Sequence, residues 1–428
     1  MFESAELAAV DPLAEEDALI ARIAELERVK AAAAAGQARA AATLDAARRA
    51  RERAEGVPAA KRGRGVAGEI ALARRDSPNR GGRHLGLAKA LVLEMPNTLA
   101  ALECGALSEW RATVIVRESA CLSVAHRRML DAELCGDVAA LDGWGDARIE
   151  AEAKKIAYRL DAQAVVDRMA KAPAERKITC RPAPDAMVYL TALLPVAQGV
   201  SVYAALRRAA DTTFDDRSRS QIMADTLVQR VTGRPAEVPV PVEVNLVMTD
   251  EALLGGTSTP AEMQGYGPIP AAVARRLVDD AAGDARSKAT LRRLYRRPVG
   301  GALLAMESRS RRFPAGLAAF VKLRDRTCRT PFCDAPVRHI DHADPHRRGG
   351  PTSSRNGLGM CAHCNYVKEV PGWTVTTDDR TDGHRATFVT PTGAAYRSSA
   401  PPAPGTTPVA MSRIEIGIAA YFAGLRAA

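Results

Sequence analysis

The sequence is poor in aromatic side chains and in lysine, and it has no long apolar run. Aromatic residues make up 4 % of its 428 residues, and lysines account for 10 of its 60 basic residues, the other 50 being arginine. No segment approaches the roughly 18 consecutive apolar residues that cross a bilayer. The beginning of the chain is acidic and lacks the basic start and apolar stretch of a signal peptide. We therefore expect a cytoplasmic protein without membrane association.

Positive charge, carried mainly by arginine, is plentiful. The formal net charge is +10 and the isoelectric point is near 9.4. Arginine presents a planar fork of donors that fits phosphate oxygens, so this bias is compatible with a nucleic-acid partner. The alternative is that an alanine- and arginine-rich chain only reflects GC-rich coding. Apolar residues, at 47 %, suffice for a sizeable core.

The N-terminal part of the chain has a strong helical pattern. Leu19, Ile23 and Leu26 recur at helical spacing before an alanine-rich stretch, which predicts a long helix over residues 15–55. Glycine and proline interrupt the basic segment that follows, so it is expected to be a loop with a short helical piece at Glu69–Arg75. That loop is either a solvated linker or a contact for a nucleic-acid backbone.

Helices continue to about residue 172, and strands appear after them. Ser123 is a suitable N-cap for one of these helices, because its hydroxyl can accept a bond from an unpaired first-turn amide. Lys177–Arg181 and Met187–Leu194 predict strands, and the second is so apolar that we expect it to be buried. The other expected elements are helices at Ser201–Ala210, Ser218–Val231 and Ile269–Asp280, a strand at Val238–Met248, hairpins over 290–308 and 372–390, and a terminal helix after the proline-rich residues 400–408. The fold class is therefore α+β.

Four of the eight cysteines form two close pairs, Cys328 with Cys333 and Cys361 with Cys364. Two thiolate pairs at such short spacing suit a tetrahedral zinc site. Four thiolates leave no position for water, so this Zn²⁺ should be structural. The alternative is a chance grouping of reduced thiols. The other four cysteines lie in apolar, helical-looking segments, where a thiol behaves as a small hydrophobe: Cys104, Cys121, Cys135 and Cys180.

A polar segment, HIDHADPHRRGG, lies between the two cysteine pairs and carries Asp341 and His342. His342 precedes Asn356 by fourteen residues, and Asn356 precedes Asn365 by nine. This register, framed by paired cysteines and containing a Gly-Gly turn, resembles the HNH (ββα-metal) nuclease module. The resemblance implies a ββα-metal fold that hydrolyses phosphodiester bonds.

The resemblance also implies a role for each of these residues. His342 would be the general base that takes a proton from the attacking water. Asp341 and Asn365 would hold one divalent cation, Mg²⁺ or Mn²⁺, through oxygen atoms. Asn356 would bond to backbone across the loop and so orient His342. Asn365 stands where many members of the family have a second histidine, which indicates a preference for hard metals and not a loss of activity.

The region before the module resembles a known arrangement as well. The segments VEVNLVMTDEALLGG, GYGPIPAAVARRLV and SRSRRFPAGLAAFVKLRDRTCRTPFC are similar to the helical domain of unknown function that precedes HNH modules in actinobacterial 13E12-repeat proteins. The likeness spans about residues 20–375. We expect an N-terminal long helix over residues 1–56, a basic linker over 57–82, a helical or α+β domain over 83–312, the HNH module with a C-terminal hairpin over 313–398, and a proline-rich linker with a terminal helix over 399–428.

Double-stranded DNA is the expected partner, because no zinc-finger repeat and no RNA-binding signature with interleaved aromatics is present. Arg347, Arg348 and Lys368 are candidate phosphate contacts, with an exposed helix lysine as the alternative for Lys368. An arginine-rich approach to the module would form a phosphate-binding rim: Arg292, Arg293, Arg296, Arg297, Arg309, Arg311, Arg312 and Arg324. A homodimer is left open.

The other histidines and a tryptophan near the module receive minor roles. His339 lies three residues before His342, so a strand would place it on the opposite face. His346 is either a phosphate contact or a solvated turn residue, and His363 is expected to be exposed. Trp373 is expected to pack the final hairpin.

The sequence is compatible with three functions. The first is a metal-dependent HNH endonuclease that cuts double-stranded DNA, with a structural zinc site. The second is a non-cleaving, zinc-stabilised DNA-binding protein of a mobile element or regulatory system. The third is a protein-interaction scaffold in which the nuclease segment is vestigial. Metal-dependent cleavage separates the first from the second, and salt-dependent DNA binding excludes the third.

Overall fold

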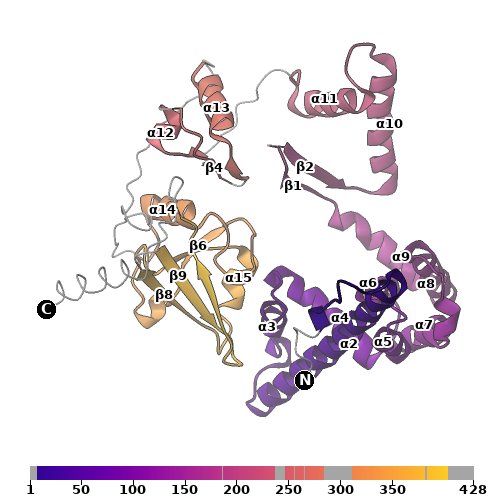
Figure 1. Ribbon diagram of the computed structural model, residues 1–428. Coiled ribbons are helices and arrows are strands. Elements are labelled where there is room, and N and C mark those ends of the chain that lie inside the picture. Colours follow the sequence, from indigo (N-terminus) through magenta and orange to yellow (C-terminus); the bar gives the residue numbers. More distant parts are fainter. Residues whose placement is uncertain are drawn as a thin grey trace. The chain divides into compact units, whose positions relative to one another are not determined.

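The computed structural model describes residues 7–185, 187–236, 246–254, 256–264, 266–283, 311–380 and 383–402. Its mixture of helices and small sheets confirms the α+β class (Figure 1). The chain divides into two compact units, Met1–Thr179 with Leu190–Phe214 and Cys180–Tyr189 with Asp215–Ala428. Several predictions lie outside the described residues: most of the strand at Val238–Met248, the hairpin over 290–308, the terminal helix, and the rim residues Arg292, Arg293, Arg296, Arg297 and Arg309.

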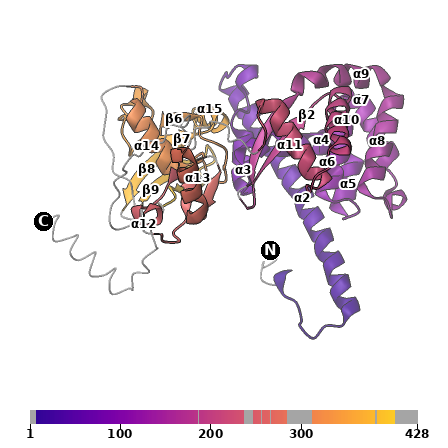
Figure 2. The same cartoon turned by 90° about the horizontal axis from the view of Figure 1, so that it is seen from above.

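The first unit is a bundle of helices. Its longest helix, α2, has 39 residues and confirms the long helix predicted over residues 15–55. The second half of α2 buries a row of alanines, whose small side chains let α4 and α5 pack closely against it, while its first half extends past the bundle (Figure 2). The helices are α2 (Glu16–Ala54), α3 (Val66–Ala73), α4 (Gly81–Leu93), α5 (Pro96–Glu103), α6 (Glu109–Ser119), α7 (Val124–Cys135), α8 (Asp146–Leu160) and α9 (Ala162–Lys171).

The segment over residues 57–82, expected to be a basic linker, is folded into this bundle. Helix α3 confirms the short helical piece predicted at Glu69–Arg75, although it begins three residues earlier. It buries Val66 and Leu72 completely, so the expectation of a solvated linker around it is wrong. Arg48 of α2 and Glu69 of α3 form an ion pair at 2.9 Å with both side chains only 4 % exposed. The apolar residues of α3 lie among charged ones in the sequence, and for this reason the segment has the composition of a loop. Short 3₁₀ turns flank α3 at Ala59–Lys61 (η1) and Pro78–Arg80 (η2).

A buried carboxylate fixes the start of α5. Met95, which precedes this helix, has no side-chain oxygen to cap it, and Asp131 of α7 takes that place. Asp131 is fully buried and accepts bonds from the backbone N–H groups of Asn97 and Thr98, both at 2.8 Å, and from the Thr98 hydroxyl at 2.6 Å. Helix α7 begins with the predicted Ser123 cap, whose hydroxyl accepts from the His126 amide.

An exposed hairpin and two helices follow the bundle. Strands β1 (Lys177–Ala183) and β2 (Met187–Leu193) confirm the predicted pair, but β2 is exposed along its whole length. The expected burial of β2 is therefore wrong, because neither face of this two-stranded sheet is covered by described residues. Helices α10 (Val196–Thr212) and α11 (Arg219–Thr232) are confirmed, and Ser218 caps α11 with a capping box.

A small sheet with one packed helix follows α11 in the second unit. Strand β4 (Ala261–Met263) lies between β3 (Leu246–Val247) and β5 (Gly267–Ile269), all antiparallel. Helix α13 (Ala271–Gly283) confirms the predicted helix and packs its apolar face on this sheet, next to the short α12 (Asp250–Leu253).

The C-terminal part of the second unit is built from two further sheets. After α14 (Ala315–Asp325), β6 (His339–His342) pairs antiparallel with β7 (Gly357–Met360), and α15 (Ala362–Val367) packs against β6. The predicted final hairpin is present as β8 (Thr374–Arg380) and β9 (Gly383–Val389). Buried and intermediate side chains alternate along β9, which also pairs antiparallel with an unpredicted third strand, β10 (Ala395–Ser399), whose side chains are exposed or intermediate.

Among the described residues, no helix alone is long and apolar enough to cross a membrane. The helix pair Pro78–Leu93 and Pro96–Glu103 is together long and apolar enough, by length and composition only, and is bent by 105°.

Candidate metal centre and the polar site beside it

Four cysteine sulfurs meet in the second unit. The Sγ atoms of Cys328, Cys333, Cys361 and Cys364 all lie within 4.8 Å of one another, and all four residues are buried. Cys333 Sγ is 3.9 Å from Cys361 Sγ and 3.7 Å from Cys364 Sγ. Two sulfurs that bind one Zn²⁺ at about 2.3 Å in a tetrahedron are roughly 3.8 Å apart. The cluster can therefore hold a metal ion, and its spacing fits structural zinc.

Two tight backbone turns bring the sulfurs together. In the first turn, the N–H of Cys333 donates to the Thr330 carbonyl at 3.0 Å, and Phe332 adopts a left-handed φ of 61°. In the second, Cys361 is the N-cap of α15 and its Sγ accepts the N–H of Cys364 at 3.4 Å. The sulfur thus has the place that a serine hydroxyl has in an ordinary cap.

The thiols share negative charge unequally. A hydrogen bond from Cys328 lowers the pKa of Cys333 to about 4. Hydrogen bonding to Cys328 raises the pKa of Cys364 above its ordinary value. Thiolates this close repel one another, and a divalent cation at their centre would let all four lose their protons.

His342 ends strand β6 and points into the protein. Only 6 % of it is exposed, and its ring lies 4.7 Å from the Phe313 ring. Its Nε2 is 2.8 Å from the Thr352 hydroxyl oxygen. Burial lowers the pKa of the imidazole below its ordinary 6.5, although Asp341 opposes this. The ring is therefore neutral at pH 7, which is the state a proton acceptor needs.

Asp341 is adjacent to His342 and is half-buried. Its Oδ1 accepts the backbone N–H of His342 at 2.9 Å, and its Oδ2 is 2.9 Å from Lys368 Nζ. Burial alone would raise the pKa of this carboxyl. The hydrogen bond and charge of Lys368, together with the His342 amide, outweigh burial and lower the pKa. Asp341 is therefore ionised at neutral pH.

Asn356 bonds to backbone on both sides of the loop between β6 and β7. Its Oδ1 accepts the N–H of Asp344 at 2.9 Å, and its Nδ2 donates to the carbonyls of Asp344 and Pro351 at 3.0 and 2.9 Å. The loop closes so tightly that a Cβ at Gly350 would lie 1.9 Å from the Asp344 carbonyl oxygen. Asn356 has the backbone-bridging position predicted for it, and Gly350 explains why the turn requires glycine.

Asn365 lies on α15, which packs against β6. Its Oδ1 is buried and has no hydrogen-bond partner among the described residues. A buried amide oxygen without a partner is costly, so it fits an oxygen donor for a hard cation. Asp341 and Asn365 each offer an oxygen atom of the type that hard divalent cations prefer.

Lys368 follows α15 and is buried, with 2 % of its side chain exposed. The structure contradicts both the predicted phosphate contact of Lys368 and the alternative of an exposed helix lysine, because its ammonium is buried against carboxylates. Besides Asp341, its ammonium contacts Glu369 Oε1 at 2.5 Å, and Glu369 Oε2 accepts from Arg347 at 2.9 Å. Glu369 was not among the site residues predicted from the sequence. Arg347 remains 66 % exposed and Arg348 is exposed, so both can still meet a phosphate.

The rim of arginines is only partly on the surface. Arg311 and Arg312 are exposed. Arg324 is buried, pairs with Asp325 at 2.7 Å and donates to the Gly357 carbonyl at 2.6 Å. Its expected role in phosphate contact is wrong, because its donors are used to hold α14 on β7. The minor expectations agree with the structure: His339, His346 and His363 are exposed, and Trp373 is buried.

His384 on β9 is a further buried histidine that the sequence did not single out. It is 3 % exposed and its Nε2 donates to the Arg355 carbonyl at 2.8 Å. Burial, with the charge of Arg324, lowers its pKa to about 4. It therefore supports the loop before β7 as a neutral side chain.

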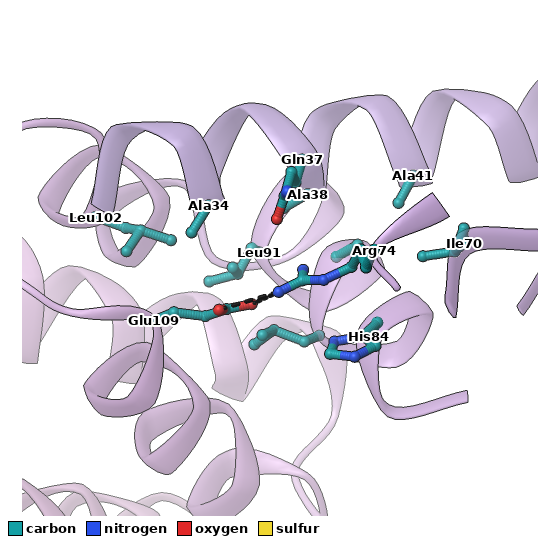
Figure 3. Close-up of a pocket in the computed structure, with 12 residues that line it drawn as sticks. Ala34, Gln37, Ala38, Ala41, Ile70, Arg74, His84, Leu91, Leu102 and Glu109 are labelled. Atoms are coloured by element: carbon teal, nitrogen blue, oxygen red, sulfur yellow. Dashed lines mark hydrogen bonds and ion pairs between the residues drawn. The ribbon is translucent and has the colours of Figure 1, made fainter. Parts of the chain in front are cut away.

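The helical unit contains one small hollow, shown in Figure 3, between α2 and α4. Arg74 pairs with Glu109 beside it, at 2.8 Å, and His84 lies next to this pair. The space holds no more than about one water molecule. It is too small for a substrate.

Fold and site together define an α+β protein whose second unit carries a four-cysteine metal-binding cluster. The chain belongs to the DUF222 family: the model described as "Domain of unknown function (DUF222)" matches residues 23–325. No curated protein and no solved structure matches the chain. The family match ends before Cys328, so the cysteine cluster and the polar site lie outside it.

Proposed function

We propose that the chain is a metal-dependent endonuclease of the HNH type that hydrolyses phosphodiester bonds of double-stranded DNA and carries a structural zinc. The observation that carries this proposal is the placement of His342: a buried imidazole at the end of β6, with Nε2 2.8 Å from the Thr352 hydroxyl oxygen and Nδ1 3.6 Å from Asp341 Oδ1. Strand β6 presents this pair, and Asn356 fixes the loop that follows it. The four-cysteine cluster supports the same small unit.

The chain's own residues account for the proton transfer. With Nε2–H of His342 donating to the Thr352 hydroxyl, Nδ1 carries the lone pair that accepts a proton from the attacking water. As the new P–O bond forms, the bond to the 3′ oxygen breaks; this oxygen takes a proton from solvent, and the products are a 5′-phosphate and a 3′-hydroxyl. Asp341 and Asn365 would hold the divalent cation, which would stabilise negative charge on the phosphate and the departing oxygen. Exposed Arg348 and Arg347 would contact the DNA backbone.

One observation favours the second candidate, a zinc-stabilised DNA-binding protein that does not cleave. The Lys368 ammonium already contacts the Asp341 oxygen that a divalent cation would need. If this contact is permanent, the zinc-framed unit binds DNA without cutting it.

A plasmid-nicking assay with Mg²⁺, with Mn²⁺ and with EDTA tests the proposal. We expect cation-dependent cleavage that His342→Ala lowers by about 10²- to 10⁴-fold, because the general base is lost. DNA binding, measured by gel shift, should remain. His339→Ala is the matched control: it removes an exposed histidine from the same strand and should leave cleavage unchanged. Equal cleavage by the wild type and His342→Ala would contradict the enzyme and leave the DNA-binding alternative.

A further inference from the structure

Lys368 occupies an unusual position for a lysine in a site that would bind a cation. Its side chain is almost fully buried, and its ammonium lies between two carboxylates, Asp341 and Glu369. A buried ammonium is stable only when it is paired with opposite charge. These two carboxylates supply that charge, so Lys368 is itself the cation that the site holds.

The ammonium and a divalent cation need the same oxygen. Asp341 Oδ1 accepts the His342 amide, and Oδ2 contacts Lys368. A divalent cation that bound Oδ2 would lie within a few ångströms of the lysine, and like charges at that distance repel strongly. Both cannot occupy the position shown for Lys368.

Glu369 offers the ammonium a second place. Its Oε1 is 2.5 Å from Lys368 Nζ and does not depend on Asp341. Its Oε2 accepts from Arg347, which holds the carboxylate in place. Lysine has a flexible stem, so the ammonium can keep Glu369 as its partner while it leaves Asp341.

We propose that Lys368 is a built-in competitor for the divalent-cation site, and that a cation binds Asp341 only by displacing the ammonium toward Glu369. This inference rests on the proposed function, since it concerns the same cation site. Its consequence is a weakened affinity for the cation and a site that stays electrically balanced when no cation is bound. Doubly charged ions displace the ammonium, and singly charged ions do not.

Direct Mn²⁺ binding, followed by electron paramagnetic resonance on the full-length, zinc-loaded chain, tests the inference without using cleavage. Lys368→Met keeps the length of the stem and removes the charge, so the Kd for Mn²⁺ should fall at least about tenfold. Lys322→Met is the matched control, because Lys322 is an exposed lysine on α14 of the same unit. Its Kd should stay within about twofold of the wild type.

The direction of the change in the Kd for Mn²⁺ shows whether Lys368 competes with the cation or only positions Asp341. If Lys368 only orients Asp341, Lys368→Met leaves the Kd unchanged or raises it, and the inference is overturned. Zinc content and circular dichroism check that the variant is folded. In the wild type, amine labelling of Lys368 read by mass spectrometry should increase when Mg²⁺ is added; no increase also overturns the inference, even if the variant does not fold.

Failure of the proposed function gives a different result. If neither the wild type nor Lys368→Met binds Mn²⁺, or if Asp341→Ala binds it as the wild type does, the cation site itself is wrong and the inference falls with it. If the wild type binds Mn²⁺ through Asp341 and Lys368→Met binds it no more tightly, only the competition is wrong.

Discussion

The helical bundle and the cysteine-framed part of the second unit are stabilised in different ways. The bundle buries many apolar side chains from α2 to α8 in two adjoining clusters. The cluster under β6 to β9 has ten buried residues, and four of them are the cysteines: Cys328, Cys333, Ala343, Leu358, Met360, Cys361, Cys364, Val375, Ala386 and Phe388. Helices that cover one another do not require an ion. Short strands and loops bury little apolar area, so we expect a metal at the cysteine cluster to stabilise them.

The largest expected effect is the loss of the metal from the cysteine cluster. Removing zinc with a chelator, or replacing Cys361 with serine, should destabilise the C-terminal part of the second unit by on the order of 10 kcal/mol. Hydrogen exchange should then show lost amide protection from β6 to β10, with α4 to α8 unchanged. Cys104→Ser, at an exposed cysteine of the bundle, is the control and should change neither. Equal loss of protection in both regions would remove the contrast between them.

A smaller effect is expected from the buried carboxylate of the bundle. Asp131→Ala leaves the first amides of α5 and the Thr98 hydroxyl without their acceptor. We expect the free energy of unfolding of the bundle to fall by about 4 kcal/mol, with zinc content unchanged. Urea unfolding measures the change. Asp137→Ala is the control, because Asp137 caps a short 3₁₀ turn, η3 (Val138–Leu141), and is exposed. A loss of zinc in Asp131→Ala would show that the two regions are not independent.

The smallest predicted effect depends on pH and concerns His384. Its pKa is about 4 in the folded chain against an ordinary 6.5, so the unfolded chain takes up the proton first as the pH falls. The stability contributed by the neutral ring is complete above about pH 6.5 and is lost as the pH falls toward 4. We expect this part to be about 2 kcal/mol less stable at pH 5 than at pH 7.

His384→Gln should remove that pH-dependent part, since glutamine still donates to the Arg355 carbonyl but does not titrate. The free energy of unfolding is measured for the wild type and the variant at both pH values. The pH dependence that comes from the thiols is common to both proteins and cancels in the difference between them. Identical pH profiles would show that burial of His384 does not control this stability.

Local features of the sequence predicted much of the fold and the grouping of the four cysteines. The long helix α2, the Ser123 cap and the pairing of β8 with β9 depend on spacing and on residues within one element. The cysteine pairs also lie close in sequence, so their meeting in one buried cluster follows the prediction.

The errors and omissions depend on contacts between distant segments. The segment around α3 has a loop-like composition, but α3 itself is buried through its contacts with α2 and α4. Strand β2 is apolar yet exposed, because no described element covers it. Lys368 and Arg324 carry charge in the sequence and are buried only because carboxylates and carbonyls elsewhere in the fold receive them. Such pairing between distant segments leaves no periodic pattern in the sequence.

The cap of α15 has a consequence for how the site can be disturbed. Cys361 supplies both a sulfur of the cluster and the acceptor at which this helix of six residues begins. So short a helix does not hold its shape alone in water. The orientation of the Asn365 carboxamide therefore depends on the Cys361 thiol one turn earlier. An oxidant or alkylating reagent that modifies this thiol would displace the Asn365 amide oxygen without contacting it.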